Sequence, residues 1–255
     1  FHESARAPTL EVPGPSSLPD LHDYQIGIVG RIRELLERED KSDRRAMLSL
    51  PTGSGKTRVA VQAITEHMRD WRKLSINSSG DSGSFFVWIA QSDELCEQAV
   101  RTFEEVWSSR GSQEILHISR LWATNEATEY TDGPQIVVAT IDKLHSVINR
   151  PGNPYDWLAS PKCVVVDEAH RAMSPEYTDV LGKLKTNIAN RTATGDESCL
   201  LGLTATPFRG WSAEATAALA SRFGRTRLDA DALGADPYKF LQDGGYLAQV
   251  QQEKL

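Results

Sequence analysis

The chain has 255 residues, of which 40% are apolar and 25% are charged, a balance typical of a globular protein with one large or two small domains. No apolar run approaches the roughly 20 residues of a membrane-spanning helix, so no membrane span is predicted. The net charge of −7 argues against a broad basic surface for nucleic acid. Any such contacts are expected from a few placed side chains and backbone amides, or from a part of the protein outside this chain.

The first residues in chain order, 1–20, are rich in Pro, Ser and Gly and predict a flexible arm. Apolar residues then recur at helical spacing from Asp23 to Glu37 and predict a helix. The short apolar run Ala46–Leu50 predicts a buried strand, and Thr57–Met68 predicts the helix that follows it.

The rest of the chain alternates apolar runs with helical patterns, and Ser92 is placed to cap the helix after the second run. Further strands are expected at Phe85–Ala90, Glu114–Ser119 and Gln135–Thr140, and within CVVVDEAH (163–170) and CLLGLTATPFRG (199–210). The strands are continuous apolar runs, which favours an α/β fold with a mostly parallel central sheet and helices on both faces. Residues after Gly210 are expected to form helices and loops on the same domain. The three cysteines, Cys96, Cys163 and Cys199, are few and widely spaced, which favours a reducing, cytoplasmic compartment over disulfides or a zinc site.

The segment from Pro51 to Thr57 joins a predicted strand to a predicted helix and has the composition of a phosphate-binding loop. Its glycines allow successive N–H groups to converge on anionic oxygens, and the helix N-terminus adds a positive dipole end. In this pattern Lys56 reaches the β- and γ-phosphates, and Thr57 offers its hydroxyl to Mg²⁺. The general pattern begins with a glycine, whereas this chain has Leu50 there.

Two carboxylates follow the apolar strand of CVVVDEAH (163–170). The carboxyl end of a parallel strand is also where the phosphate-binding loop is expected. Asp167 is predicted to hold Mg²⁺, directly or through water, and Glu168 to act as the general base that polarises the attacking water.

Three stretches in this order, LPTGSGKT, DEAH and LTATP, resemble motifs I, II and III of superfamily 2 helicases and translocases. VWIAQSDELCEQA resembles motif Ia, VVATIDKL resembles motif Ib, and LHDYQIGIV resembles the upstream segment whose Gln reads adenine. GLTATPFR and LHDYQ are more similar to restriction-enzyme translocase subunits and DNA repair helicases than to DEAD-box RNA helicases. The resemblance implies a RecA-like P-loop NTPase lobe over 21–245, with 246–255 beginning a linker or an edge strand.

The resemblance also implies roles for single residues and the cofactors ATP and Mg²⁺. Gln25 would contact the adenine edge, while Ser92 and Thr140 would contact the nucleic-acid backbone. The residues that would couple the ATP site to these contacts are His170, Thr204 and Thr206. The residues expected around ATP are Gln25, Thr52, Gly53, Ser54, Gly55, Lys56 and Thr57. Family members often carry Arg where His22 stands and a basic residue near Asp93.

In this superfamily ATP lies between two RecA-like lobes, and the second lobe supplies arginines to the γ-phosphate. About 45 residues follow LTATPFR, too few for another such lobe, so we expect this chain to be the first lobe of a larger enzyme. RFGRTR, at Arg222–Arg227, is interpreted as a solvated basic patch that could touch nucleic acid.

The leading hypothesis is a motor lobe that acts on double-stranded DNA in restriction, phage defence or repair, with a possible nuclease or methylase partner. One alternative is an RNA helicase or RNA-dependent ATPase. Another is a nucleotide-binding regulatory module without motor activity, although the presence of Lys56, Thr57, Asp167 and Glu168 argues against it.

Overall fold

The computed structural model describes residues 9–12, 18–40, 44–75, 85–150, 154–186, 197–205, 212–234 and 237–247. Its strands are β1 (Thr9–Val12), β2 (Arg45–Ser49), β3 (Phe85–Ala90), β4 (Leu116–Leu121), β5 (Gln135–Thr140), β6 (Cys163–Asp167) and β7 (Cys199–Thr204). Its α-helices are α1 (Asp23–Glu37), α2 (Lys56–Ser75), α3 (Asp93–Arg110), α4 (Ile141–Ile148), α5 (Pro175–Lys183), α6 (Ala213–Arg222), α7 (Ala230–Leu233) and α8 (Pro237–Asp243). The described residues also include the 3₁₀ helices η2 (Asp156–Ala159) and η3 (Ala169–Arg171).

The strands form one sheet in the order β1-β4-β5-β3-β6-β7-β2. All neighbouring pairs from β4 to β2 are parallel, and β1 alone runs antiparallel, beside β4. The mostly parallel sheet expected from the sequence is therefore confirmed. The prediction of a flexible arm over 1–20 is wrong for Thr9–Val12, because the open edge of β4 supplies main-chain partners that the sequence of this segment does not reveal.

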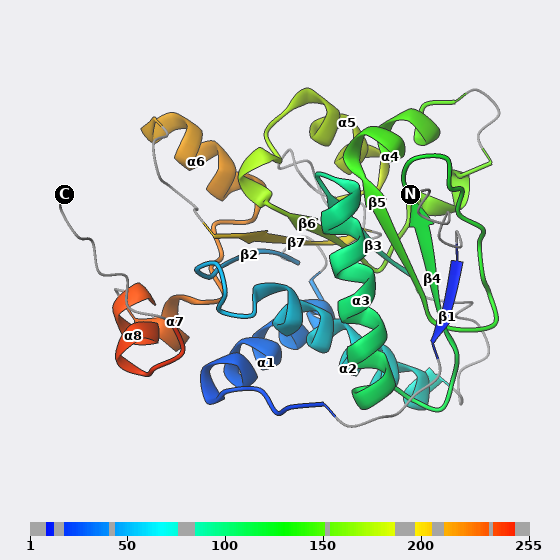
Figure 1. Cartoon of the computed structure of the whole chain (residues 1–255). Helices are drawn as coiled ribbons and strands as arrows, with labels where there is room; N and C mark the ends of the chain where they lie inside the picture. Colours follow the sequence, from blue (N-terminus) through cyan, green and yellow to red (C-terminus); the bar gives the residue numbers. More distant parts are fainter. Residues whose placement is uncertain are drawn as a thin grey trace, which may run out of the picture.

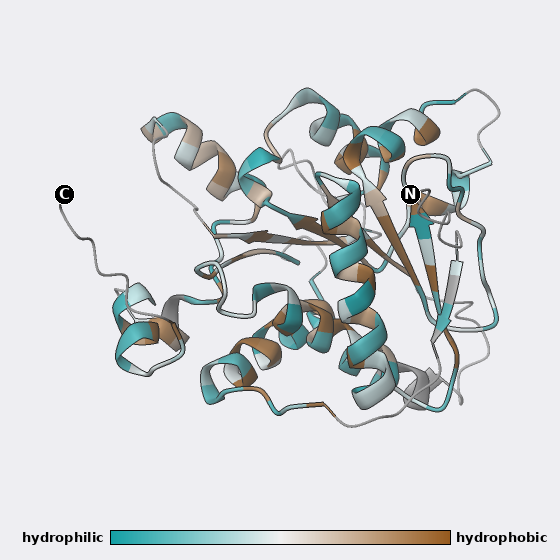
Figure 2. Ribbon diagram, viewed as in Figure 1, coloured by the Kyte–Doolittle hydropathy of each residue, from teal (hydrophilic) through white to brown (hydrophobic). Residues whose placement is uncertain are grey.

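Helices cover both faces of the sheet (Figure 1). One core cluster joins the sheet to α1, α2 and α3, with α7 and α8 at its end, and the other joins the opposite face to α4, α5 and α6. Strand residues alternate between the two clusters, as Phe86 and Trp88 do against Val87 and Ile89. A strand covered on both faces favours apolar residues at successive positions, which explains why β5, β6 and β7 are largely brown in Figure 2.

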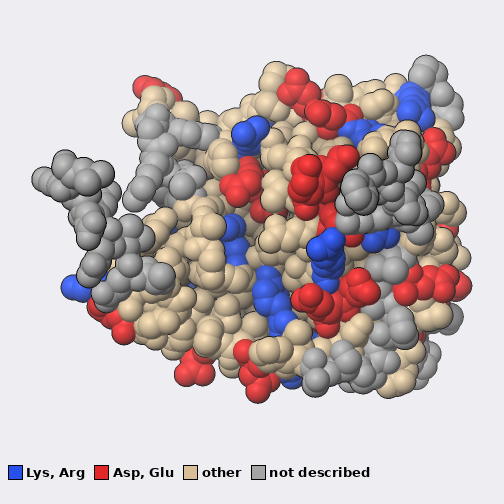
Figure 3. Space-filling model, in the orientation of Figure 1, with Lys and Arg blue, Asp and Glu red and all other residues tan. Residues whose placement is uncertain are grey.

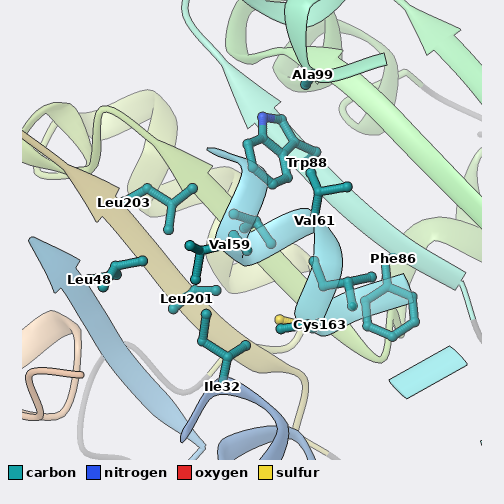
Figure 4. Close-up of a cluster of buried hydrophobic side chains, with 14 of the residues drawn as sticks. Ile32, Leu48, Val59, Val61, Phe86, Trp88, Ala99, Cys163, Leu201 and Leu203 are labelled. Atoms are coloured by element: carbon teal, nitrogen blue, oxygen red, sulfur yellow. The ribbon is translucent and has the colours of Figure 1, made fainter. Parts of the chain in front are cut away.

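The first cluster shows how the strands receive the helices (Figure 4). Leu48, Leu201 and Leu203 project from neighbouring strands toward α1 and α2, where Ile32 and Val59 meet them. Trp88 on β3 packs edge-on against Phe103 of α3, with ring centroids 5.7 Å apart. The packing of Val59 among the leucines of β2 and β7 holds the start of α2 against these strands.

Most predicted elements agree with the structure, and three differ at their ends; β2 begins and ends one residue earlier than the predicted Ala46–Leu50. The helices and strands expected at Asp23–Glu37, Phe85–Ala90 and Gln135–Thr140 have those bounds. α2 continues beyond Met68 to Ser75, because Arg69 and Asp70 are anchored to neighbouring helices: Arg69 donates to Arg110 O over 3.1 Å, and Asp70 accepts from the Arg33 guanidinium over 3.0 Å. The strand expected at 114–119 lies two residues later, at Leu116–Leu121.

The segment after β7 closes the molecule beside β2. Met47 N donates to Thr226 O over 2.9 Å, and Leu228 N donates to Met47 O over 3.0 Å. The interpretation of Arg222–Arg227 as a solvated patch is wrong for Arg222, which is buried and donates to Ala172 O and Thr178 Oγ1. Arg222 lies on the face of α6 that packs against α5. The basic composition of the segment does not show which of its residues face the core.

The end of the described chain forms a turn rather than a strand. Tyr246 N and Leu247 N donate to Leu241 O over 2.8 and 3.1 Å, so both residues fold back on α8. The remaining residues of the expected linker or edge strand, 248–255, lie outside the described residues. None of the described helices combines the length and the apolar character that a membrane crossing requires.

Candidate active site

The residues predicted to carry the chemistry lie at the carboxyl ends of the parallel strands. Ser49 pairs with Thr204 at the ends of β2 and β7, and Asp167 pairs with Leu203 where β6 meets β7. Ala90 pairs with Thr140 at the ends of β3 and β5. The strand order therefore brings segments far apart in the sequence to one edge of the sheet, where ligands bind in open α/β sheets.

The predicted phosphate-binding loop joins β2 to α2 with two residues in the left-handed region, Gly53 at φ 82° and Gly55 at φ 83°. Ser54 folds back on the loop, since its hydroxyl donates to Pro51 O over 2.6 Å. Lys56 and Thr57 open α2 and are partly exposed, and neither side chain hydrogen bonds to another described residue. The loop therefore presents an ammonium, a hydroxyl and a helix N-terminus together, the groups that a nucleotide phosphate requires.

Gln25 and Tyr24 hold this loop from α1. Gln25 Nε2 donates to Ser54 O over 3.1 Å, and its Oε1 accepts from His22 N over 2.9 Å. The Tyr24 hydroxyl donates to the same Ser54 O over 2.9 Å. A side-chain amide has two donor hydrogens and two acceptor lone pairs, so Gln25 retains one of each, and its contact with adenine stays a prediction.

The two carboxylates of DEAH occupy different environments. Asp167 is buried at the end of β6, and burial raises the pKa of its carboxyl; the Glu168 charge raises it further, while the Glu168 N–H bond and the Lys56 charge lower it. Glu168 is partly exposed and stands in the left-handed region at φ 53°, which is strained for a residue with a Cβ. Its amide donates to Asp167 Oδ1 over 3.0 Å, so one turn fixes both carboxylates.

The predicted coupling residues lie next to this turn. His170 Nδ1 is 3.2 Å from Glu168 Oε2 and 3.5 Å from Thr204 Oγ1. The structure thus brings His170 between the end of β7 and the second carboxylate, while its coupling role stays a prediction. Thr206, the third member of the set, lies outside the described residues.

The residues present fit Mg²⁺ as the metal. The Thr57 hydroxyl and the Asp167 carboxylate are hard oxygen donors, which Mg²⁺ prefers. The described part of the chain contains no group of three or more His, Cys, Asp or Glu side chains able to hold a metal. A magnesium ion held by one carboxylate, one hydroxyl, water and phosphate oxygens does not need such a group.

The predicted nucleic-acid residues open the helices after β3 and β5. Ser92 caps α3, as expected, because its hydroxyl accepts from Leu95 N over 3.4 Å. Thr140 begins α4 without a side-chain cap and is buried. The structure places both at the same sheet edge, with Ser92 more accessible than Thr140, and their contact with nucleic acid stays a prediction.

Three residues near the site were missed from the sequence. The first is Tyr24, whose hydroxyl holds the loop. The second is Asp229, which is fully buried, accepts from Ser49 N over 2.9 Å and forms an ion pair with Arg227. Tyr246 packs against His22 and Tyr24 with ring centroids 4.6 and 5.1 Å apart. Asp229 and Tyr246 reach the site from the far end of the chain, and no local pattern marks them.

Comparison with known proteins finds similarity to a restriction-enzyme subunit family and to helicases. A family model described as type III restriction enzyme, res subunit, matches residues 18–209. The ATP-dependent DNA helicase Hel308 of Pyrococcus horikoshii is 26% identical over 161 residues, which cover 63% of this chain and 19% of that protein. The U5 small nuclear ribonucleoprotein 200 kDa helicase of Drosophila melanogaster is 31% identical over 170 residues, or 65% of this chain and 8% of that protein.

A solved structure is also similar: a nuclease-deletion mutant of the Type ISP restriction-modification enzyme LlaGI in complex with a DNA substrate mimic. It has a TM-score of 0.44 and 15% sequence identity, over 74% of this chain and 18% of that one. The chain spans less than 20% of the length of each of these three proteins. Because the family model covers well over half of the sequence, this chain belongs to the family of type III restriction enzyme res subunits and forms a superfamily 2 helicase motor domain.

Proposed function

We propose that this chain is the ATP-binding first motor lobe of a nucleic-acid-dependent ATPase that acts on double-stranded DNA. One observation supports this most: the phosphate-binding loop and the DEAH turn meet at one sheet edge, close enough for the Lys56 charge to lower the pKa of Asp167. Loop and turn come from segments more than 100 residues apart in the sequence.

Each group at this edge has a role in hydrolysis. Lys56 and the N–H groups of the loop bind and orient the β- and γ-phosphates, and Gln25 holds the base edge. Glu168 orients the attacking water and accepts its proton, so that ADP and phosphate leave. Mg²⁺, when bound at Thr57 and Asp167, would neutralise charge on the phosphate oxygens. The proposed partners are nucleic acid and a second RecA-like lobe, with a nuclease or methylase as a further one.

Two substitutions in the intact protein test the site. Lys56→Ala removes the cation that stabilises developing phosphate charge and is expected to lower ATP turnover by roughly 10²–10³-fold. Glu168→Gln removes the base and is expected to lower turnover by roughly 10²–10⁴-fold. Both variants should melt at the wild-type temperature.

The matched controls are Lys183→Ala on α5 and Glu34→Gln on the exposed face of α1. Both should keep wild-type turnover. Unchanged turnover in either site variant, with native melting, would remove the assignment and favour a regulatory nucleotide-binding module.

The choice of DNA over RNA rests on membership of a restriction-enzyme family, and one observation supports the second candidate. The Drosophila relative, at 31% identity, is named as a ribonucleoprotein helicase. On the face drawn in Figure 3, lysines and arginines of the described residues form small groups interspersed with acidic ones. Such a surface suits a few placed contacts with either nucleic acid.

Competition between duplex DNA and duplex RNA in stimulating the ATPase of the intact protein decides between the two. Preferential stimulation by DNA supports the leading proposal. Stimulation by RNA alone replaces it with an RNA-dependent ATPase.

A further inference from the structure

Three side chains from three segments meet beside the DEAH turn, and none of them has a role in the ATP site proposed above. Gln91 follows β3, Arg171 ends η3, and Tyr177 lies on α5. Arg171 Nη1 donates to Gln91 Oε1 over 2.8 Å, and Gln91 Nε2 donates to the Tyr177 hydroxyl over 2.7 Å. Gln91 thus bridges a cation and a buried phenol that lie 80 and 86 residues away in the sequence.

One end of this bridge is fixed to the DEAH turn. Arg171 N donates to Glu168 O over 2.9 Å, so Arg171 stands on the same turn as the general base. Tyr177 is fully enclosed, and its pKa is raised to about 12, chiefly by burial, with the Asp167 charge contributing. The Tyr177 hydroxyl is therefore close enough to Asp167 to be influenced by its charge. A movement of the DEAH turn would displace Arg171 and change the charge near Tyr177, the two hydrogen-bond partners of Gln91.

The other end lies on the predicted nucleic-acid element. Gln91 immediately precedes Ser92. The Ser92 hydroxyl caps α3, and the Ser92 carbonyl oxygen accepts from Cys96 N over 3.0 Å. Because Gln91 and Ser92 are adjacent in the chain, a displacement of Gln91 would shift the start of α3 and the hydroxyl expected to meet the nucleic-acid backbone.

We propose that Gln91 is a positioning residue that links the DEAH turn to the start of α3 and makes the affinity for nucleic acid depend on the bound nucleotide. The inference rests on the function proposed above and deepens it. Gln91 touches neither nucleotide nor reacting atoms; it acts through Arg171, Tyr177 and Ser92.

Substitutions at Gln91 in the intact protein separate this role from simple packing. Gln91→Leu has nearly the same size and removes both hydrogen bonds. Gln91→Glu keeps both, because a carboxylate accepts from Arg171 and from the Tyr177 hydroxyl, which then donates. The matched control is Asn149→Leu, which removes another side-chain amide that reaches α5, at Asp179.

The measurement is the ratio of duplex-DNA affinities with a non-hydrolysable ATP analogue and with ADP, together with kcat and KM for ATP without nucleic acid. In Gln91→Leu the affinity ratio should move toward one, by on the order of tenfold, while basal kcat and KM stay within about twofold. Gln91→Glu and Asn149→Leu should keep the wild-type ratio.

A wild-type ratio in Gln91→Leu overturns the inference, and so does an equal loss in Gln91→Glu. If Gln91→Leu does not fold, Tyr177→Phe replaces it, since it removes only the hydroxyl and should shift the ratio in the same direction. A wild-type enzyme whose ATPase responds to neither DNA nor RNA instead refutes the proposed function itself, so the two failures are distinguishable.

Discussion

His67 is a buried titratable group on α2 that the proposed chemistry does not use. Its ring packs edge-on against Phe86, and neither nitrogen has a hydrogen-bond partner among the described residues. Burial chiefly lowers its pKa to about 4; the Lys162 and Arg33 charges also lower it, and Glu37, 3.5 Å away, raises it. His67 is therefore neutral in the folded chain at physiological pH.

A pH dependence of stability follows from this group. Between about pH 6.5 and 4 the unfolded chain takes up a proton at His67 that the folded chain does not, so the free energy of unfolding falls as the pH falls. The loss from this group is roughly 3 kcal/mol, complete below about pH 4 and absent above about pH 6.5. Denaturant unfolding at several pH values measures it.

The matched variants are His67→Leu, which should flatten this part of the profile, and Met68→Leu, a buried non-titrating change on the same helix, which should not. An unchanged slope in His67→Leu would show that other groups cause it.

Individual site residues differ in how far the sequence could reveal them. Lys56, Thr57, Asp167 and Glu168 stand in short motifs whose strand and helix context is readable locally. Asp229 reaches Ser49 across 180 residues of sequence, and the Tyr24 hydroxyl reaches Ser54 across 30. Such contacts depend on the order of the strands, which no local pattern encodes.

At the scale of elements, Gly202 on β7 shows how closely the site turn packs on the sheet. A Cβ at this position would lie 2.6 Å from Phe223 Cε1 and 2.8 Å from Ala169 Cβ. Ala169 begins η3, directly after Glu168, so the absence of a side chain at Gly202 lets the DEAH turn rest on β7.

Gly202→Ala is therefore expected to destabilise the chain by about 1–3 kcal/mol through overpacking, and to lower ATP turnover by displacing the turn. Thermal unfolding and turnover of the intact protein measure the two effects. Gly30→Ala on α1 is the matched control, because its Cβ would meet nothing within 4 Å and should stabilise the helix. Equal stability in the two variants would show that Phe223 and Ala169 move aside without cost.

The elements most readable from the sequence were those with two covered faces or one regular apolar stripe. β3 is an unbroken apolar run, β5 and β6 each contain a run of four apolar residues, and α1 repeats its buried residues at helical spacing. β1 was missed because an edge strand needs only main-chain partners, and these come from β4. The extra turns of α2 were missed because charged residues extend a helix when other helices hold them.

At the scale of the whole molecule, the proposed ATP site is one half of the site expected between two RecA-like lobes. The described residues at this sheet edge are proposed to bind phosphate and activate water, and the arginines expected at the γ-phosphate would come from the proposed second lobe. This chain alone should bind nucleotide and turn over ATP some 10³–10⁵-fold more slowly than the intact protein. A steady-state ATPase assay on the chain and on the intact protein, each with and without nucleic acid, measures the difference. Robust nucleic-acid-stimulated ATP turnover by the isolated chain would contradict the proposal that a second lobe completes the site.

The outer edge of β2 has a consequence for how copies of this molecule behave toward one another. An open strand edge offers N–H groups on which a second chain can add a strand, a common route to aggregation. Here Met47 N already donates to Thr226 O, and Ser49 N donates to the Asp229 carboxylate. The segment from Thr226 to Asp229 thus occupies these two donors through one isolated bridge and one side chain. We therefore expect the folded chain to resist strand addition at β2, the strand that leads into the phosphate-binding loop.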